Sequence, residues 1–532
     1  MVIANKIRLT SIIFAVILLI LSFFYLLIGY QFALNEGFFD EGLTVYGATR
    51  ILNGDMPYRD FWSLYAPGEF YLLAGIFKLF GASIVVERIA TVAIEALFAC
   101  FVYLLVKKFI FSYSALAVWM LTLAWLRVRM PYSCPMTTAL LFFAIASLGM
   151  ANFIFTKKLR WLVVSGVFTG ITALFRQDIG FYLSISTFLT ISALRYHEIY
   201  THKKAWLLWI KKSFSAYIVY CLGVVLIIAP MIFYFISKAA VSNFVSSAII
   251  FPIKVYPKVR YLSFPNMLIF YLPLLIFFII IIYLTFYMKG NEIKLQKKWL
   301  ILFCLFCGIF FFNYSRMRFD MRHLLPTMIP AIILLGFLAS IIMDKFYVRY
   351  RQSLKLIINL VGLILLVVAI IPKAKVLFEH IQHPGPELKL SRARGCYDQM
   401  EFSIDQQAAI QYIQERTSFN EKIFVGNLRY DRIVMNDIMF YFLSERHSAT
   451  VYHELHPGLV TTKDVQEKII KDIKKSGVRY IVCWTGDGKN VEANESNKSS
   501  GITELEDFIQ RNFKLIRKFK SYLILYRSSD FS

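Results

Sequence analysis

The chain has 532 residues, of which 58% are hydrophobic and 17% aromatic, and its formal net charge is +24. An ordinary soluble domain is roughly 45–50% apolar, so this composition excludes a single soluble fold. In a soluble protein the charge would indicate nucleic-acid binding, but here most Lys and Arg residues lie between apolar runs. We therefore expect a polytopic α-helical membrane protein with no nucleic-acid partner.

The apolar runs predict the membrane spans. A bilayer core about 30 Å thick needs roughly 20 apolar residues per helix. Runs of this length begin near Leu9, Ile84, Tyr113, Met136, Ser213, Phe264, Trp299, Leu324 and Leu354. The stretch 161–194 is too long for one span, and Arg176-Gln177-Asp178 interrupts it, so we expect two helices that meet there. The total is about eleven spans, and the first run is too long for a signal peptide.

Basic residues between the spans predict the orientation. If the N-terminus is cytoplasmic, every inner loop carries Lys or Arg, as the positive-inside rule requires. The first loop, residues 31–83, and the C-terminal segment, residues 374–532, then lie on the extracytoplasmic face. We expect an integral protein of a bacterial inner or plasma membrane, with residues 1–373 as its transmembrane domain.

The composition turns polar after Pro372, which predicts a soluble extracytoplasmic α/β domain over residues 374–532. Helical periodicity covers 403–417, and Thr461 or Thr462 can cap a helix that ends at Gly477. The segments KIFVG, VRYIVCW and YLILYR have the pattern of strands. Residues 486–501 read as a mobile loop.

The acidic pair Asp40-Glu41 in the first loop is the candidate catalytic group. Carboxylates beside a membrane are costly to place there unless they serve a site. On a helix, neighbouring side chains point about 100° apart, so only one of the two can face a given cavity. The alternative is that both acids only favour the positive end of a helix through residues 45–48.

The first loop resembles that of the C-type-fold (GT-C) membrane glycosyltransferases, the superfamily of the protein O-mannosyltransferases and aminoarabinose transferases. The matching features are the Asp-Glu pair, Gly54-Asp55-Met56-Pro57-Tyr58, Pro67, Phe80-Gly81 and Arg88. The likeness is close over residues 36–90 and looser over the whole chain. It implies a helical bundle followed by an extracytoplasmic domain, and a sugar donor linked to polyprenyl phosphate. The acceptor would be a lipid, a glycan or a protein.

By this resemblance Asp40 is the catalytic carboxylate and Glu41 has a supporting role. A sugar on polyprenyl phosphate already has a good leaving group, so the reaction needs a base rather than a strong acid. Asp40 would take the proton of an acceptor hydroxyl that attacks from the face opposite the phosphate, which inverts configuration.

The aminoarabinose transferases carry a phosphate-binding lysine just before the loop proline, whereas this chain has Ala66 before Pro67. The phosphate contact must then come from elsewhere, and arginine matches phosphate oxygens with two parallel hydrogen bonds. Arg322 is the preferred candidate donor-phosphate ligand, followed by Arg176, Arg260 and Lys258.

Asp178, Tyr58 and His323 are candidates for positioning the sugar or the acceptor. Each assignment has an alternative. Arg176 and Asp178 can form a local pair that caps two helices, Arg322 can meet lipid head groups, and residues 254–261 can form an interfacial belt.

The sequence predicts no cofactor and no metal site, and it leaves a divalent cation open. His453-Glu-Leu-His456 has the spacing of two metal ligands on a helix, but Pro457 follows at once. No glycine-rich phosphate loop follows a strand, which disfavours a nucleotide-sugar donor.

Two other classes compete with a glycosyltransferase. A transporter or flippase of lipid-linked glycans commonly has two related halves, and the halves here look unrelated. A cell-surface polysaccharide polymerase or ligase usually relies on a large late outer loop, whereas the longest loop between predicted spans here is the first.

Overall fold

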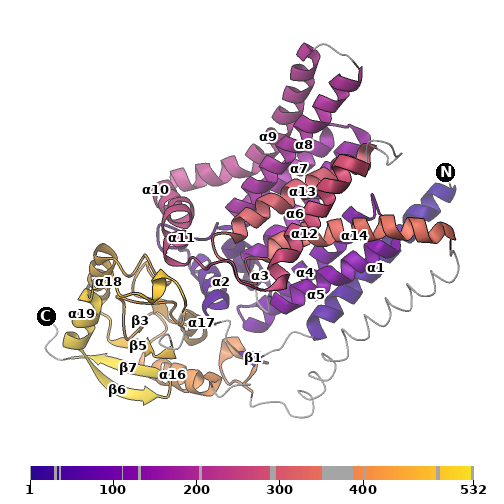
Figure 1. The fold of residues 1–532 in the computed structure, drawn as a ribbon. Coiled ribbons are helices and arrows are strands. Elements are labelled where there is room, and N and C mark those ends of the chain that lie inside the picture. The colour runs from indigo at the N-terminus through magenta and orange to yellow at the C-terminus, as the bar shows by residue number, and fades with distance from the viewer. Residues whose placement is uncertain are drawn as a thin grey trace.

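The computed structural model consists of a helical bundle with a mixed α/β domain at one end (Figure 1). It describes residues 2–28, 33–34, 38–110, 112–129, 134–202, 206–287, 295–349, 387–398, 402–486 and 492–528. The span expected from Leu354 and the predicted boundary between residues 373 and 374 lie outside these residues.

The bundle is built from long apolar helices. They are α1 (Val2–Ile28), α4 (Ile84–Val106), α5 (Ser112–Arg129), α6 (Pro135–Thr156), α7 (Arg160–Phe175), α8 (Gln177–His202), α9 (Trp206–Ser237), α12 (Leu268–Ile282), α13 (Leu295–Ser315) and α14 (Leu325–Arg349). Short elements at the end near the α/β domain are α10 (Val241–Phe244), η1 (Val245–Val255) and α11 (Tyr256–Val259), while η2 (Tyr283–Tyr287) continues α12. The predicted break is confirmed, because α7 ends at Phe175 and α8 begins at Gln177.

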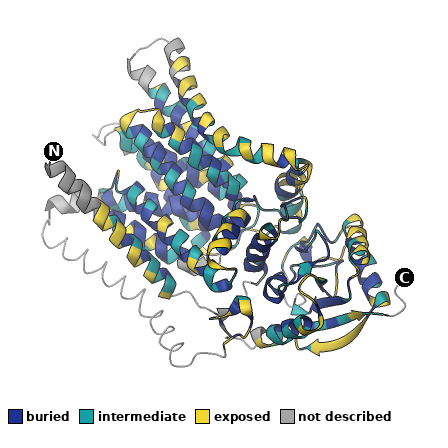
Figure 2. Ribbon diagram, turned by 180° about the vertical axis from the view of Figure 1, so that it is seen from behind, coloured by how far each residue is buried: buried dark blue, intermediate teal, exposed yellow. Residues whose placement is uncertain are grey.

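The bundle belongs in a membrane. Within the described residues, six helical stretches are both long and apolar enough to cross a bilayer, and three shorter apolar helices accompany them. Many large apolar side chains on the outward faces are exposed, including Leu226 and Phe233 on α9 and Leu268 and Phe278 on α12 (Figure 2). Water would not tolerate so large an apolar surface, so these faces contact lipid. The total of about eleven spans stays a prediction.

The first loop folds into two helices, α2 (Phe38–Leu52) and α3 (Gly68–Phe80), which lie between the bundle and the α/β domain (Figure 1). Asp40 and Glu41 lie in the first turn of α2, so the condition under which their side chains point in different directions is met. Ser83 begins α4 by accepting a hydrogen bond from the backbone N–H of Val86 through its side chain.

The C-terminal residues form the predicted α/β domain. Its five-stranded sheet has the order β4-β3-β5-β7-β6, with β3 parallel to β4 and β5, and β7 antiparallel to β5 and β6. The strands are β3 (Lys422–Asn427), β4 (His447–Ser448), β5 (Tyr480–Trp484), β6 (Phe513–Phe519) and β7 (Tyr522–Arg527). The helices are η3 (Ser391–Ala393), α16 (Phe402–Arg416), α17 (Met439–Ser444), α18 (Lys463–Lys475), η5 (Glu495–Asn497) and α19 (Glu504–Asn512). As predicted, Thr462 precedes α18 and Gly477, with φ +61°, follows it.

The first loop and the α/β domain share one core, and this contact positions α2. Strand β1 (Ala33–Leu34) pairs in parallel with β2 (Tyr397–Asp398). The ring of Tyr46 stacks on Tyr441 with centroids 5.0 Å apart, and its hydroxyl accepts the backbone N–H of Ser448 at 2.7 Å. At Gly42 a Cβ would lie 2.5 Å from the backbone nitrogen of Met439, so glycine allows α2 and α17 to pack backbone to backbone. The α/β domain therefore fixes the position of α2.

Candidate functional site

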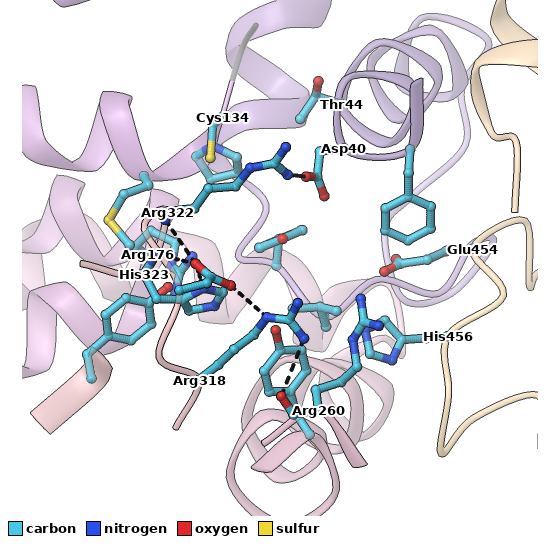
Figure 3. Close-up of a pocket in the computed structure, with 18 residues that line it drawn as sticks. Asp40, Thr44, Cys134, Arg176, Arg260, Arg318, Arg322, His323, Glu454 and His456 are labelled. Atoms are coloured by element: carbon cyan, nitrogen blue, oxygen red, sulfur yellow. Dashed lines mark hydrogen bonds and ion pairs between the residues drawn. The ribbon is translucent and has the colours of Figure 1, made fainter. Parts of the chain in front are cut away.

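Asp40 opens onto a cavity where the first loop, the bundle and the α/β domain meet (Figure 3). Its carboxylate accepts a hydrogen bond from Arg322, with 2.6 Å between Oδ2 and the Arg322 Nη1. About a third of the Asp40 side chain and half of the Arg322 side chain are exposed. Asp40 is thus a paired carboxylate that a ligand can reach.

Glu41 lies elsewhere, as the angle between adjacent helical side chains requires. It is buried and accepts two hydrogen bonds from Arg88 on α4, at 2.7 and 2.9 Å. It does not line the cavity. This bidentate pair ties the first turn of α2 to the bundle, so the two neighbouring acids occupy separate environments.

Four arginines from separate segments line the cavity, and we call them the arginine wall: Arg176, Arg260, Arg318 and Arg322. Arg176 separates α7 from α8, Arg260 follows α11, and the other two lie in the loop between α13 and α14. The sequence predicted Arg176, Arg260 and Arg322 as phosphate ligands, and all three line the cavity. Because guanidinium groups from distant segments converge here, the wall has the chemistry of an anion site.

Arg176 is held by acid and aromatic partners. Asp178 accepts two hydrogen bonds from its guanidinium, at 2.6 and 3.1 Å. The same group lies 5.0 Å from the ring centre of Tyr314 and 5.8 Å from that of Tyr65. Asp178 itself does not line the cavity, and its two hydrogen bonds orient the guanidinium group of Arg176.

The loop between α13 and α14 is ordered around Asp320. This carboxylate contacts Arg318 at 2.7 Å and His323 Nδ1 at 2.9 Å, and it accepts the backbone N–H groups of Arg322 and His323. Burial raises the pKa of Asp320, but the hydrogen bonds and charge of His323, together with the charge of Arg318, outweigh burial and hold the pKa well below its ordinary value. His323, a predicted positioning residue, lines the cavity and stacks on Tyr314.

Glu492 of the α/β domain binds two members of the arginine wall. It accepts two hydrogen bonds from Arg318 at 2.8 Å, and its Oε2 lies 3.0 Å from Nη1 of Arg260. Burial raises its pKa, yet the hydrogen bonds of Arg318 and the charge of Arg260 lower the pKa to about 2. Glu492 is therefore an ionised interdomain clamp.

Two residues of the motif His453-Glu-Leu-His456 complete the cavity, namely Glu454 and His456. His453 instead lies against Arg50, with 3.4 Å between Nδ1 and Nη1. Burial and the charge of Arg260 lower the pKa of His456 to about 3, so this imidazole is neutral at physiological pH. Among the described residues no group of three His, Cys, Asp or Glu side chains has the geometry to hold a metal ion.

Two further predicted residues lie outside the cavity lining. Tyr58 is buried against Phe235 and Phe244, and its hydroxyl donates to the backbone carbonyl of Tyr65 at 2.6 Å, so it supports the loop. Lys258 is exposed on α11. Ala66, where the resemblance expects lysine, is buried, and its neighbour Tyr65 lines the cavity.

Sequence reasoning did not select Arg318, Glu454 or His456 as site residues. Arg318 is one of three arginines within seven residues, and spacing alone does not show which of them faces inward. Glu454 and His456 belong to the motif His453-Glu-Leu-His456, which stands out in the sequence by its metal-ligand spacing. The sequence does not show which residues of the bundle they approach. Their position depends on how the α/β domain docks on the bundle.

No protein-family model and no curated protein sequence matches the chain. Solved structures match its fold. ArnT from Cupriavidus metallidurans bound to undecaprenyl phosphate aligns over 98% of both chains, with a TM-score of 0.55 and 12% identity. The archaeal oligosaccharyltransferase AglB from Archaeoglobus fulgidus, in complex with an inhibitory peptide and a dolichol-phosphate, aligns over 98% of this chain and 75% of its own. Its TM-score is 0.52 and its identity 10%.

Both matching proteins are membrane glycosyltransferases of the GT-C fold. The chain therefore has this fold, which confirms the architecture that its first loop predicted. At identities of 10–12% the match concerns the fold, and the roles of individual residues are argued from the cavity itself.

Proposed function

We propose that this chain with the GT-C fold is an inverting glycosyltransferase that moves a sugar from polyprenyl phosphate to an acceptor on the extracytoplasmic face. The observation that carries the proposal is the convergence of Asp40 with four arginines in one cavity. An anion site beside a reachable carboxylate provides both groups that the reaction needs: cations for the lipid phosphate and a base for the acceptor.

In the proposed step, Asp40 accepts the proton of an acceptor hydroxyl as the acceptor oxygen forms a bond to the anomeric carbon. The bond between that carbon and the phosphate oxygen breaks, and its electron pair stays on the phosphate. The arginine wall stabilises this charge. Arg322 pairs with Asp40, and donor phosphate would take over part of that contact and release the base.

The other predicted residues take supporting roles in this scheme. His323 would contact sugar or acceptor from the cavity lining, and Asp178 would act through Arg176. Glu41 would hold α2, and Tyr58 would hold the backbone of Tyr65. Lys258 would contribute only a distant positive charge.

Asp40→Asn tests the base. Sugar transfer from undecaprenyl phosphosugars should fall by about 10²–10⁴-fold, while binding of undecaprenyl phosphate persists. The matched control is Asp55→Asn, which alters a carboxylate of the same loop that pairs with Arg50 outside the cavity lining. A fully active Asp40→Asn protein would exclude Asp40 as the base.

Thiol labelling tests the orientation. In a background without the native cysteines, a single cysteine replaces either Arg59 in the first loop or Lys498 in the α/β domain, both of which are exposed. A membrane-impermeant reagent should label both from the extracytoplasmic side of intact cells. Labelling only after the cells are opened would overturn the proposed topology.

A further inference from the structure

Glu454 is a buried acid that the proposed step does not use. It lies between β4 and α18, its side chain is fully buried, and it lines the cavity with its carboxyl directed inward (Figure 3). Within the described part of the chain, neither carboxyl oxygen has a hydrogen-bond partner. A buried polar group without a partner costs folding free energy, so its presence calls for a ligand.

The backbone around Glu454 is held rigidly. The Asn436 side chain donates a hydrogen bond to the carbonyl of His453 at 2.9 Å and accepts one from the N–H of Leu455 at 3.0 Å. The two flanking histidines are also buried among aromatic rings. Residues on both sides of Glu454 are therefore fixed, and its side chain is presented to the cavity from a preorganised segment.

The surroundings of Glu454 suit a neutral, hydroxyl-bearing ligand. Burial raises the pKa of this carboxyl well above its ordinary value; Asp40 raises it further, and Arg260 lowers it. A protonated carboxyl offers one O–H donor and one carbonyl acceptor, and a sugar hydroxyl can match either.

The position of Glu454 indicates which part of a donor it would meet. In Figure 3 it lies across the cavity from Arg176 and His323, with Asp40 and Arg322 along one side and Arg318 and Arg260 along the other. A phosphate on the arginine wall would direct its attached sugar into the space that Asp40 and Glu454 border.

We propose that Glu454 binds hydroxyl groups of the transferred sugar and thereby selects the sugar, while the arginine wall binds the phosphate. The proposal rests on the proposed function, because it presumes a polyprenyl phosphosugar as donor. Sites built to hydrogen-bond a substrate hydroxyl discriminate strongly, since an analogue without it leaves a buried polar group unpaired.

Binding to the full-length protein in lipid nanodiscs separates sugar from phosphate contacts. The probes are undecaprenyl phosphate and its glucose, mannose, galactose and arabinose derivatives. We define the sugar increment as the Kd of undecaprenyl phosphate divided by the Kd of a derivative. The wild type should bind the bare lipid and show an increment above one for at least one sugar.

Glu454→Ala should reduce that increment by about tenfold or more and leave the Kd of bare undecaprenyl phosphate within about twofold. Glu454→Gln keeps one donor and one acceptor, so it should retain part of the increment and should not lower the thermal midpoint of the ligand-free protein. The control is Asp437→Asn, which alters another buried carboxyl of the same domain. Asp437 is bonded to Gln406 and Tyr522, so this variant should keep the wild-type increment.

The outcomes separate the two proposals. A wild type that binds no undecaprenyl phosphate contradicts the proposed function itself. A wild type that binds the lipid but gains nothing from any attached sugar contradicts only the role of Glu454, as does an alanine variant with an unchanged increment. Equal weakening of bare and sugar-bearing lipids would show a structural role and also overturn the assignment.

Discussion

The two sides of the cavity differ in how their polar groups are satisfied. On the bundle side, the arginine wall is engaged by Asp40, Asp178, Asp320 and Glu492. On the side of the α/β domain, the carboxyl oxygens of Glu454 have no hydrogen-bond partner among the described residues, and burial keeps the His456 imidazole neutral. Charges that pair with one another can exchange partners when an anion binds, whereas an uncharged polar lining suits the neutral part of a ligand. The comparison indicates that the two domains divide donor recognition between them.

The largest expected effect concerns the tie between α2 and the bundle. Glu41→Gln removes the negative charge from the buried ion pair with Arg88 and should destabilise the protein by roughly 3–5 kcal/mol. Thermal unfolding in detergent measures this loss. The double variant Glu41→Leu with Arg88→Met removes both charges and should recover most of it. If the single variant is as stable as the double, the pair does not anchor Asp40.

A smaller effect is expected for the arginine wall. Arg322→Ala removes a charge-assisted phosphate contact and should weaken binding of undecaprenyl phosphate by about 10–100-fold. The sugar increment should stay unchanged, because the proposed contact between Glu454 and the sugar lies on the other side of the cavity. The control is Lys258→Ala, which removes an exposed basic residue outside the cavity lining and should change the affinity by no more than about twofold. Equal effects of the two variants would indicate nonspecific electrostatic attraction.

The smallest effect is expected for the interdomain clamp, and it depends on pH. The pKa of Glu492 is lowered from its ordinary 4.5 to about 2 in the folded protein. Its ion pairs therefore contribute fully above about pH 4.5, and the contribution is lost as the pH falls towards about 2. We expect roughly 2 kcal/mol, allowing for partial solvent screening. Thermal midpoints from pH 7 to 3 should fall more steeply for the wild type than for Glu492→Gln, and parallel curves would contradict the clamp.

Local patterns predicted the parts of the fold that depend on nearby residues. Within the described residues, the approximate starts of the spans, the break at Arg176 and the position of Asp40 in the first turn of a helix follow from apolar length and from turn and cap positions. The first-loop motif and the charged residues between spans selected Asp40, Arg176, Arg260, Arg322 and His323 as candidates, and all five line the cavity. These residues lie at the ends of helices. The length of each apolar run sets where along the membrane normal such an end lies.

The other site residues depend on packing between distant segments. Glu454 reaches the cavity because Tyr46 and Gly42 of α2 dock against α17 and β4, and no local pattern encodes that contact. The direction of neighbouring side chains around a helix also decides that Glu41 pairs with Arg88 while Asp40 faces the cavity. Helical geometry predicts only that the two adjacent acids face different environments; the resemblance selected Asp40 as the acid at the site, and Asp40 is the one that lines the cavity.

The shared core of the first loop and the α/β domain also sets an order of events during synthesis. The hydroxyl of Tyr46 bonds to a residue 402 positions further along the chain. At about 5–20 residues per second, the ribosome needs roughly 20–80 seconds to make that distance. During this interval the helix that carries Asp40 has left the ribosome without the partner that completes its packing. Asp40 is thus among the earliest parts of the proposed site to be made and among the last to be positioned.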